Sequence, residues 1–233
     1  MKNIDSLSWE AIQHSLNSCG FATIKSLMTH NECEKMISIY DENSTYRKTV
    51  MMERHRFGKG EYKYFDYPLP PTILGIRKSI YPHLVPIANQ WMKVLKFEME
   101  YPTIHDDFIQ RCHEQGQQKP TPLILSYKKS GFNTLHQDLY GEVYFPFQLA
   151  VFLSEYGSEY EGGEFVLTEQ IPRSQSKPIV LKPKKGDALI FATSYRPING
   201  RRGYYRGNLR HGVSEVTSGE RFTLGIIFHD ATS

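Results

Sequence analysis

The second half of the chain constrains the fold most, because short β-type segments follow one another there with no helical segment between them. Each segment is rich in branched and aromatic residues and is bounded by Gly, Pro, Asn or Ser, which is typical of strands joined by turns. Eight strands are predicted, over residues 123–127, 133–138, 147–154, 164–168, 179–182, 188–192, 209–216 and 222–229. A succession of strands of this kind predicts a β-sandwich or a jelly roll.

The first half is predicted to be mainly helical. A first helix opens at residues 8–10, carries apolar residues at helical spacing, and stops at Gly20. A second helix is expected over residues 31–40, because residues 29–32 have the form of a capping box. Between these helices, residues 21–25 alternate like a short strand.

Two further helices are expected before the β-rich half begins. Apolar residues recur at helical spacing over residues 73–96, and Pro82 and Pro86 are expected to interrupt that helix. A last helix is expected to be capped at residues 103–106, by a threonine and an aspartate, and closed by Gly116.

The chain length favours one enlarged domain. With 233 residues the chain is long for one minimal domain and short for two. Hydrophobic residues make up 39% and aromatic residues 13%, which is enough to form a large core. We therefore predict a single α+β domain over residues 1–233. Residues 1–122 form a mainly helical support region packed on the sheet, and residues 123–233 form the jelly-roll core.

Several classes of protein are disfavoured. The longest uninterrupted apolar run is five residues, 149–153, whereas a membrane-spanning helix needs about 20. Residues 1–6 show neither an apolar stretch nor a cleavage site of a secretory signal, so a cytoplasmic protein with no membrane partner is expected. Cys19, Cys33 and Cys112 are too scattered for a disulfide framework or zinc site and are expected to be buried thiols. The formal net charge of +3 is too small to indicate a polyanionic partner by itself.

His136 and Asp138 are the first residues that indicate chemistry. On a strand, side chains two residues apart share a face, so this imidazole and this carboxylate can reach one ion. His211 lies on another predicted strand, and two histidines with one carboxylate form the facial ligand set of non-haem Fe(II) oxygenases. The alternative is a chance His-x-Asp in a chain with nine histidines, together with a His211 that only packs in the core.

Arg221 lies ten residues after His211, at the start of the last apolar strand. A guanidinium on an inward face needs an anion, and a dicarboxylate matches its forked geometry. Thr223 shares that face and can add a hydroxyl. A surface ion pair of Arg221 is the alternative, but the occurrence of Arg221 together with the three candidate ligands favours a metal and anion site.

Five blocks of sequence carry a family resemblance. They are residues 57–65 (FGKGEYKYF), 136–142 (HQDLYGE), 162–165 (GGEF), 210–213 (RHGV) and 228–230 (FHD). With the spacing of the candidate ligands, the chain resembles the Fe(II)/2-oxoglutarate-dependent dioxygenase superfamily, whose fold is a double-stranded β-helix. It is most similar, over nearly its whole length, to a bacterial oxygenase family described as acting oxidatively on damaged DNA.

The resemblance implies a set of cofactors and roles. Fe(II) is held by His136, Asp138 and His211, and the distal carboxylate of 2-oxoglutarate is bound by Arg221. With dioxygen (O2), the co-substrate is converted to succinate and CO2 while a substrate C–H is hydroxylated. Tyr127 occupies the position at which related prolyl hydroxylases carry a co-substrate-binding tyrosine, although core packing explains a strand tyrosine equally well.

Two segments combine basic and aromatic residues, 53–67 and 195–210, and both are expected to be loops. Cationic groups for phosphates and rings for stacking are what a single-stranded nucleic acid needs. Segment 195–210 is expected near the mouth of the site because it leads directly into His211. Solvated loops and ring packing are the alternative explanation. The arginines assigned to this possible contact are Arg54, Arg56, Arg196, Arg201, Arg202 and Arg206.

Other substrates and functions stay open. Arg221 is the last arginine of the chain, so the second downstream arginine of alkylation-repair dioxygenases is missing, and a prolyl-hydroxylase-like action on a protein or peptide side chain is the alternative. A non-catalytic jelly-roll binding module is a third hypothesis. Asp138 disfavours a cupin, in which the second ligand is usually His. The pairs at residues 112–113 and 229–230 complete no ligand set and are interpreted as structural.

Overall fold

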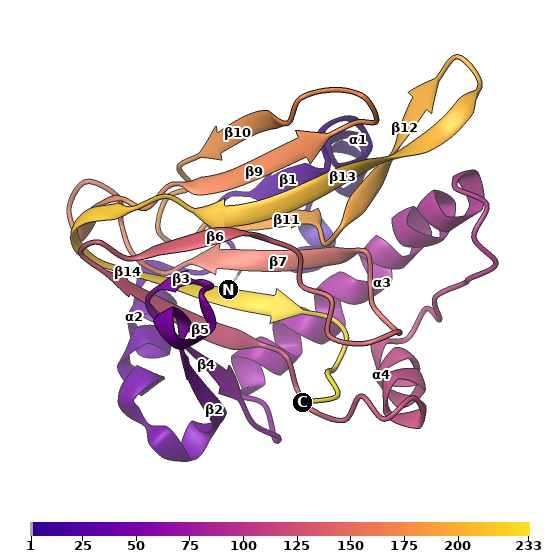
Figure 1. Cartoon of the computed structure of the whole chain (residues 1–233). Coiled ribbons are helices and arrows are strands. Elements are labelled where there is room, and N and C mark those ends of the chain that lie inside the picture. Colours follow the sequence, from indigo (N-terminus) through magenta and orange to yellow (C-terminus); the bar gives the residue numbers. More distant parts are fainter. Residues whose placement is uncertain (1) are drawn as a thin grey trace.

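Two antiparallel sheets form the centre of the computed structural model, which describes residues 2–233 (Figure 1). Met1, with which the N-terminal segment considered above begins, lies outside the described residues. The strands are β1 (Phe21–Ile24), β2 (Tyr46–Met51), β3 (Gly58–Lys59), β4 (Glu61–Phe65), β5 (Leu123–Lys128), β6 (Phe132–His136), β7 (Phe147–Phe152), β8 (Tyr160–Gly162), β9 (Phe165–Gln170), β10 (Lys177–Leu181), β11 (Ala188–Ala192), β12 (Tyr195–Gly200), β13 (Gly203–Val213) and β14 (Val216–Ile227).

The strand order confirms the predicted double-stranded β-helix. The larger sheet has the order β1-β11-β7-β14-β5-β4-β2, with β8 paired to β14. The smaller sheet has the order β10-β9-β13-β6-β3, with β12 paired to β13. Strands that are distant in sequence, such as β6 and β13, thereby become neighbours.

Helices cover the outer face of the larger sheet. The α-helices are α1 (Trp9–Cys19), α2 (His30–Ser38), α3 (Pro71–Val94) and α4 (His105–Glu114), and the 3-10 helices are η1 (Ile4–Ser6), η2 (Ile39–Asp41), η3 (Asn43–Thr45) and η4 (Met52–His55). Figure 1 shows α3 running along the sheet, with the C-terminal segment close to α4. Within residues 2–233, no helix is both long and apolar enough to cross a bilayer.

The central strand β7 shows why the sheet is buried on both faces. All six of its residues are buried. Leu149 and Val151 belong to the large core that includes the α3 residues, whereas Ala150 and Phe152 belong to a separate cluster with Phe165 of the smaller sheet. Because side chains alternate along a strand, β7 faces the helical layer with one set and the interior between the two sheets with the other.

Pro82 and Pro86 do not interrupt helix α3, which is continuous over 24 residues. Both prolines lie on the exposed face of the helix. The residues whose carbonyl groups lose a hydrogen-bond donor there, Lys78 and Pro82, are exposed, while the opposite face is held by buried residues such as Ile80 and Leu84. The expectation of an interrupted helix was therefore wrong.

The predicted strands of the second half are present, but some boundaries differ. The last two are shifted, because the chain turns at residues 214–215, which the prediction had included in a strand. The first half contributes more strand than predicted: β1 was expected, whereas β2, β3 and β4 were missed. The two basic, aromatic segments are also not loops, since 195–210 forms the β12–β13 hairpin and 53–67 contains η4, β3 and β4.

Three smaller expectations have different outcomes. The capping box at the start of α2 is present, with Thr29 and Glu32 as partners. Helix α4 begins after Ile104, without a side-chain cap, so the cap expected at residues 103–106 was wrong. Cys33 and Cys112 are buried, but Cys19 is exposed because it ends α1 on the solvent side.

Candidate active site

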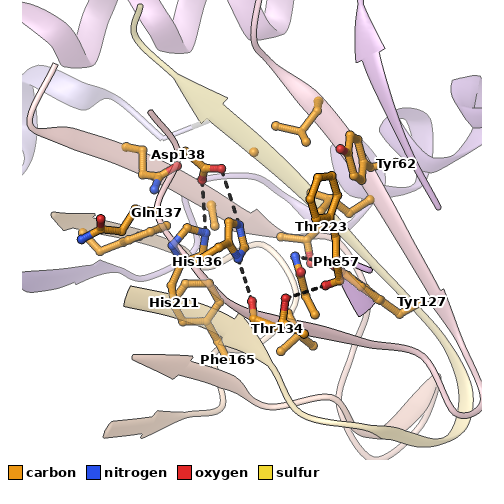
Figure 2. Close-up of a pocket in the computed structure, with 18 of the residues that line it drawn as sticks. Phe57, Tyr62, Tyr127, Thr134, His136, Gln137, Asp138, Phe165, His211 and Thr223 are labelled. Atoms are coloured by element: carbon orange, nitrogen blue, oxygen red, sulfur yellow. Dashed lines mark hydrogen bonds and ion pairs between the residues drawn. The ribbon is translucent and has the colours of Figure 1, made fainter. Parts of the chain in front are cut away.

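A cavity of about 230 Å³ lies between the two sheets (Figure 2). Strands β5, β6, β7, β13 and β14 all contribute residues to its wall. The cavity is lined by all six residues that the sequence indicated: Tyr127, His136, Asp138, His211, Arg221 and Thr223. The fold therefore collects, in one enclosure, residues that are up to 96 positions apart in the sequence.

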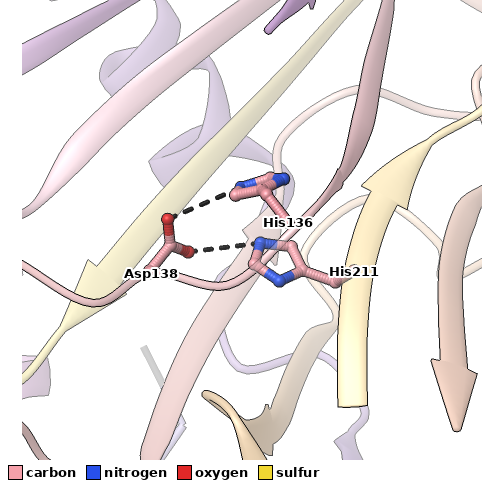
Figure 3. Close-up of side chains that lie close together, drawn as sticks. All are labelled: His136, Asp138 and His211. Atoms are coloured by element: carbon pink, nitrogen blue, oxygen red, sulfur yellow. Dashed lines mark ion pairs between the residues drawn. The ribbon is translucent and has the colours of Figure 1, made fainter. Parts of the chain in front are cut away.

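His136, Asp138 and His211 come together because β6 and β13 pair in register, with His136 opposite His211. Asp138 lies just beyond the end of β6, and its two carboxylate oxygens face the two rings (Figure 3). Oδ1 is 3.5 Å from Nε2 of His136, and Oδ2 is 3.2 Å from Nε2 of His211. One ligand atom from each residue lies within 4.8 Å of the others.

Hydrogen bonds orient these three side chains. His136 donates from Nδ1 to the carbonyl oxygen of Thr134 at 2.8 Å, which leaves Nε2 free for a metal. The hydroxyl of Tyr140 donates to Oδ1 of Asp138 at 2.8 Å. Gln137 donates to the carbonyl oxygens of two residues near the start of β12 and on β13, at 2.8 Å each, and so holds the segment after β6 against the hairpin. Only the positions of Tyr140 and Gln137 in the 136–142 block signalled these roles in the sequence.

The charges of the three groups support one another. Burial disfavours the charge of Asp138, but the two nearby imidazoles outweigh it and hold the pKa of that carboxyl well below its usual range. Burial likewise opposes the imidazolium of His136, yet attraction to Asp138 raises the pKa of His136. The pKa of His211 is lowered by burial and by repulsion from His136.

This donor set fits a divalent metal ion. Two imidazole nitrogens and one carboxylate on one side of a cavity leave positions open on the other side, as in the facial sites of Fe(II) oxygenases. Across residues 2–233, the structure brings together no other group of three or more His, Cys, Asp or Glu side chains in this way.

Arg221 is a buried cation without an anion. Its side chain is 1% exposed, and none of its three guanidinium nitrogens has a hydrogen-bond partner among the described residues. The guanidinium carbon lies 5.6 Å from the ring of Tyr127, 5.4 Å from that of Phe152 and 5.9 Å from that of Tyr160. These rings attract a cation but do not neutralise it, so the cavity has one unfilled place for an anionic group.

Two neighbours of Arg221 support this interpretation. The buried hydroxyl of Thr223, on the same face of β14, also has no hydrogen-bond partner within the described chain. A side-chain carbon at Gly163 would lie 2.9 Å from Cδ of Arg221, so the glycine provides the space that the arginine occupies. Tyr127 is buried, and its hydroxyl accepts a hydrogen bond from Asn133 at 3.2 Å. Burial raises the pKa of Tyr127, which keeps its hydroxyl protonated.

The arginines of segment 195–210 do not lie where the sequence suggested. Arg196 is paired with Glu169, with 2.6 Å between Nε and Oε1. Arg210 is exposed, and strand alternation directs its side chain away from the face that carries His211. The hairpin projects beyond the sheets (Figure 1), and within the described chain no residue of 195–210 lines the cavity. The remaining arginines of the hairpin, Arg201, Arg202 and Arg206, are exposed.

The arginines of segment 53–67 lie closer to the site. Arg54 and Arg56 are exposed on and beside η4, and the adjacent Phe57 lines the cavity. Segment 53–67 is therefore the better candidate for substrate contact, although its proximity to the site was not apparent from the sequence.

Comparison with known proteins identifies the family. Residues 60–231, about three quarters of the chain, match the model of a family described as "Oxygenase, catalysing oxidative methylation of damaged DNA". The chain belongs to this oxygenase family. Two Mycobacterium tuberculosis relatives, both described as uncharacterized proteins, are 42% identical over 167 residues, which are 72% of this chain and 72% of theirs.

Solved structures show the same fold. A Pseudomonas putida prolyl-4-hydroxylase aligns with a TM-score of 0.56 at 12% identity, covering 93% of this chain and 96% of its own. A 2OG-Fe(II) oxygenase-family protein from Burkholderia pseudomallei has a TM-score of 0.55 at 14% identity, with coverage of 97% and 93%. The collagen prolyl hydroxylase of Paramecium bursaria Chlorella virus-1, in complex with 2-oxoglutarate, has a TM-score of 0.53 at 17% identity. The alignment covers 90% of this chain and 96% of that protein.

Proposed function

We propose that this oxygenase depends on Fe(II) and 2-oxoglutarate and hydroxylates a substrate C–H, with release of succinate and CO2. One observation carries the proposal: the cavity that holds two histidines and an aspartate also holds a buried arginine that has no anion. A metal ion and a dicarboxylate together satisfy both halves of that cavity. The fold and the family support the same reaction class.

Each residue has a defined role in this proposal. His136, Asp138 and His211 hold Fe(II), and Arg221 with Thr223 binds the distal carboxylate of 2-oxoglutarate. Tyr127 packs its ring against the guanidinium and presents a protonated hydroxyl to the cavity. Iron, 2-oxoglutarate and dioxygen, when bound, supply the oxidising chemistry, while the protein positions the reactants and excludes water.

The proposed substrate is a damaged or modified nucleic acid, and the proposed process is DNA repair. The family description names damaged DNA. Arg54 and Arg56 are exposed beside the cavity, and exposed arginines are the groups that contact phosphates. Arg201, Arg202 and Arg206 on the hairpin can extend the contact, whereas Arg196 is already neutralised by Glu169.

A protein or peptide side chain is the second candidate substrate. Arg221, ten residues after His211, is the arrangement typical of prolyl hydroxylases, and several structures of similar fold are prolyl hydroxylases. One of them, from Trichoplax adhaerens, is in complex with a peptide fragment, with 12% identity and a TM-score of 0.52.

Turnover of 2-oxoglutarate tests the chemistry. The purified protein is expected to form succinate only with Fe(II) and dioxygen, and His136→Ala or Asp138→Ala is expected to reduce succinate to background because each removes a metal ligand. His14→Ala, an exposed histidine on α1, is the matched control and is expected to behave as the parent. Unchanged turnover in the two ligand variants would falsify the metal assignment. Binding of both cofactors without any succinate would instead favour a non-catalytic binding module.

A further inference from the structure

Phe57 is a large aromatic residue that is exposed to solvent and also lines the cavity. Its side chain is 47% exposed. Of the large apolar side chains that are exposed within residues 2–233, it is the one that contributes to the cavity wall. The ring of Phe57, drawn among the lining residues in Figure 2, is therefore a part of the cavity wall that solvent reaches.

The backbone of Phe57 is held firmly to β6. Its carbonyl oxygen accepts hydrogen bonds from the backbone N–H of Thr134 at 2.9 Å and from the hydroxyl of Thr134 at 2.8 Å. Its own N–H donates to the carbonyl oxygen of Met52, which is fully buried. Thr134 in turn accepts the hydrogen bond from the ring of His136. One residue thus links Phe57 to a candidate metal ligand.

Two glycines allow this close attachment. A side-chain carbon at Gly58 would lie 2.3 Å from the carbonyl oxygen of Phe132, and one at Gly60 would lie 2.9 Å from the ring of Tyr127. Both residues have positive φ angles, 136° and 150°, which other residues rarely adopt. The run of residues 57–60, part of the block noted in the sequence, is therefore built to hold the segment against the cavity wall.

The residues next to Phe57 in the chain are aromatic and cationic. The ring of His55 stacks against that of Phe57, with 5.4 Å between the centroids and 20° between the planes. Arg54, Arg56 and Lys59 are all exposed, and none of them forms an ion pair with another described residue. The carboxylate of Glu53 accepts from the backbone N–H of Gly60 at 3.3 Å. An exposed ring on a firmly held backbone, with unpaired cations beside it in the chain, matches a base with its phosphates better than it matches a neutral peptide.

We propose that Phe57 is a stacking platform for a base of a single-stranded nucleic acid at the mouth of the cavity, with Arg54 and Arg56 contacting the adjacent phosphates. Phe57 is in this view the residue that selects a planar group for presentation to the metal. The proposal rests on the proposed function for the identity of the substrate. The platform adds to that function a residue, Phe57, whose stacking on a base would favour a nucleic acid over other substrates.

Binding of a short single-stranded oligodeoxynucleotide, followed by fluorescence anisotropy, tests the platform. Phe57→Ala is expected to weaken binding about 5- to 150-fold, the range that corresponds to one base–aromatic stack of ~1–3 kcal/mol. Phe57→Trp is expected to retain binding. Phe132→Ala is the matched control, because Phe132 is 38% exposed on β6, the strand that pairs with β3, but does not line the cavity. It is expected to bind as the parent.

Salt dependence separates stacking from charge. Replacing Arg54 and Arg56 by Gln is expected to flatten the slope of log affinity against log salt, whereas Phe57→Ala lowers the affinity without changing that slope. An oligonucleotide that incorporates 2-aminopurine is expected to lose fluorescence on binding to the parent and not on binding to Phe57→Ala, because only a stacked base is quenched. Thermal unfolding of each variant checks that the fold is intact.

Three results overturn the proposal. They are equal affinities of Phe57→Ala and Phe132→Ala, no measurable oligonucleotide binding at low salt, or a proline-containing peptide whose binding requires Phe57 while the oligonucleotide does not. None of these measurements needs iron or turnover. Succinate formation by a protein that fails them leaves the proposed chemistry standing, and Phe57-dependent binding by a protein that forms no succinate leaves the platform standing.

Discussion

At the scale of single residues, Arg221 defines what the cavity binds. A buried guanidinium is costly unless an anion accompanies it, and here three aromatic rings and a glycine create its space without neutralising it. A bound anion would offset the free-energy cost of burying this charge. The three candidate metal ligands differ from Arg221, because the negative charge of Asp138 already lies beside the two imidazoles.

Removal of the Arg221 charge is expected to separate co-substrate binding from metal binding. Arg221→Leu should weaken the binding of 2-oxoglutarate at least about 30-fold, which corresponds to ~2 kcal/mol or more for the loss of a buried charge pair. Binding of Mn(II), used as a probe of the metal site, should survive because the three ligands are unchanged. Titration calorimetry measures both. Arg206→Leu, which removes an exposed arginine, is the control, and equal 2-oxoglutarate affinity in the Arg221 variant and the parent would sink the assignment.

At the scale of elements, very short strands decide the geometry of the site. β3 has only two residues, yet it pairs with β6 and fixes segment 52–60 beside the cavity. The register of β6 and β13 brings the two histidines opposite each other, with 4.2 Å between the ring centroids. A shift of one residue in that register would turn His136 to the opposite face of the sheet.

Gly58 allows the pairing of β3, so a side chain there is expected to disrupt it. Gly58→Ala places a carbon against a backbone oxygen at a positive φ angle, and a loss of about 1–3 kcal/mol in the free energy of unfolding is expected. Gly75→Ala is the matched control: within helix α3 nothing lies within 4 Å of the added carbon, so a gain of about 0.4–1 kcal/mol is expected. Denaturant unfolding measures both, and equal effects of the two substitutions would contradict this account.

At the scale of the whole molecule, buried polar groups join the helical layer to the C-terminal segment. Asp230 is fully buried and pairs with Arg77 of α3 at 2.8 Å and with His113 of α4 at 2.9 Å. His105, the first residue of α4, contacts the carbonyl oxygen of Phe228 at 2.9 Å. The pairs at residues 112–113 and 229–230, interpreted from the sequence as structural, do lie in this layer.

Acid is expected to destabilise the protein through two buried histidines. Burial lowers the pKa of His105 and of His229 to about 3, from an ordinary value of 6.5. Below pH 6.5 the unfolded chain binds protons that the folded chain excludes, so stability falls as the pH falls, by about 1 kcal/mol per pH unit for each histidine on average between pH 7 and pH 5. Denaturant unfolding between pH 7 and about pH 5 measures the slope. His105→Gln should make the slope shallower by about that amount, and an unchanged slope would refute the assignment.

Local patterns predicted most strands of the second half and the candidate site residues. Alternation and turn residues predicted eight of the ten strands of the second half, because these features act over a few neighbouring residues. Strands β8 and β12 were not predicted. The ligand and anion-binding candidates were recognised because their residue types suit few other purposes at that spacing, and the resemblance to known oxygenases added Tyr127. Strands β2, β3 and β4 were missed because their charged and aromatic residues resemble those of a loop. Pairing with strands that are distant in the sequence, such as β5 and β6, makes them strands.

The linear order of residues was enough to indicate the class of fold, the family and the residues from which a metal and anion site can be built. These three inferences depend on residue types and on short spacings, which can be seen in the sequence before the chain folds. Three outcomes required the folded chain: helix α3 continues past Pro82 and Pro86, no residue of the β12–β13 hairpin lines the cavity, and the exposed Phe57 does line it. Those outcomes depend on strand register, solvent exposure and long-range contacts, and these arise only when distant segments pack together.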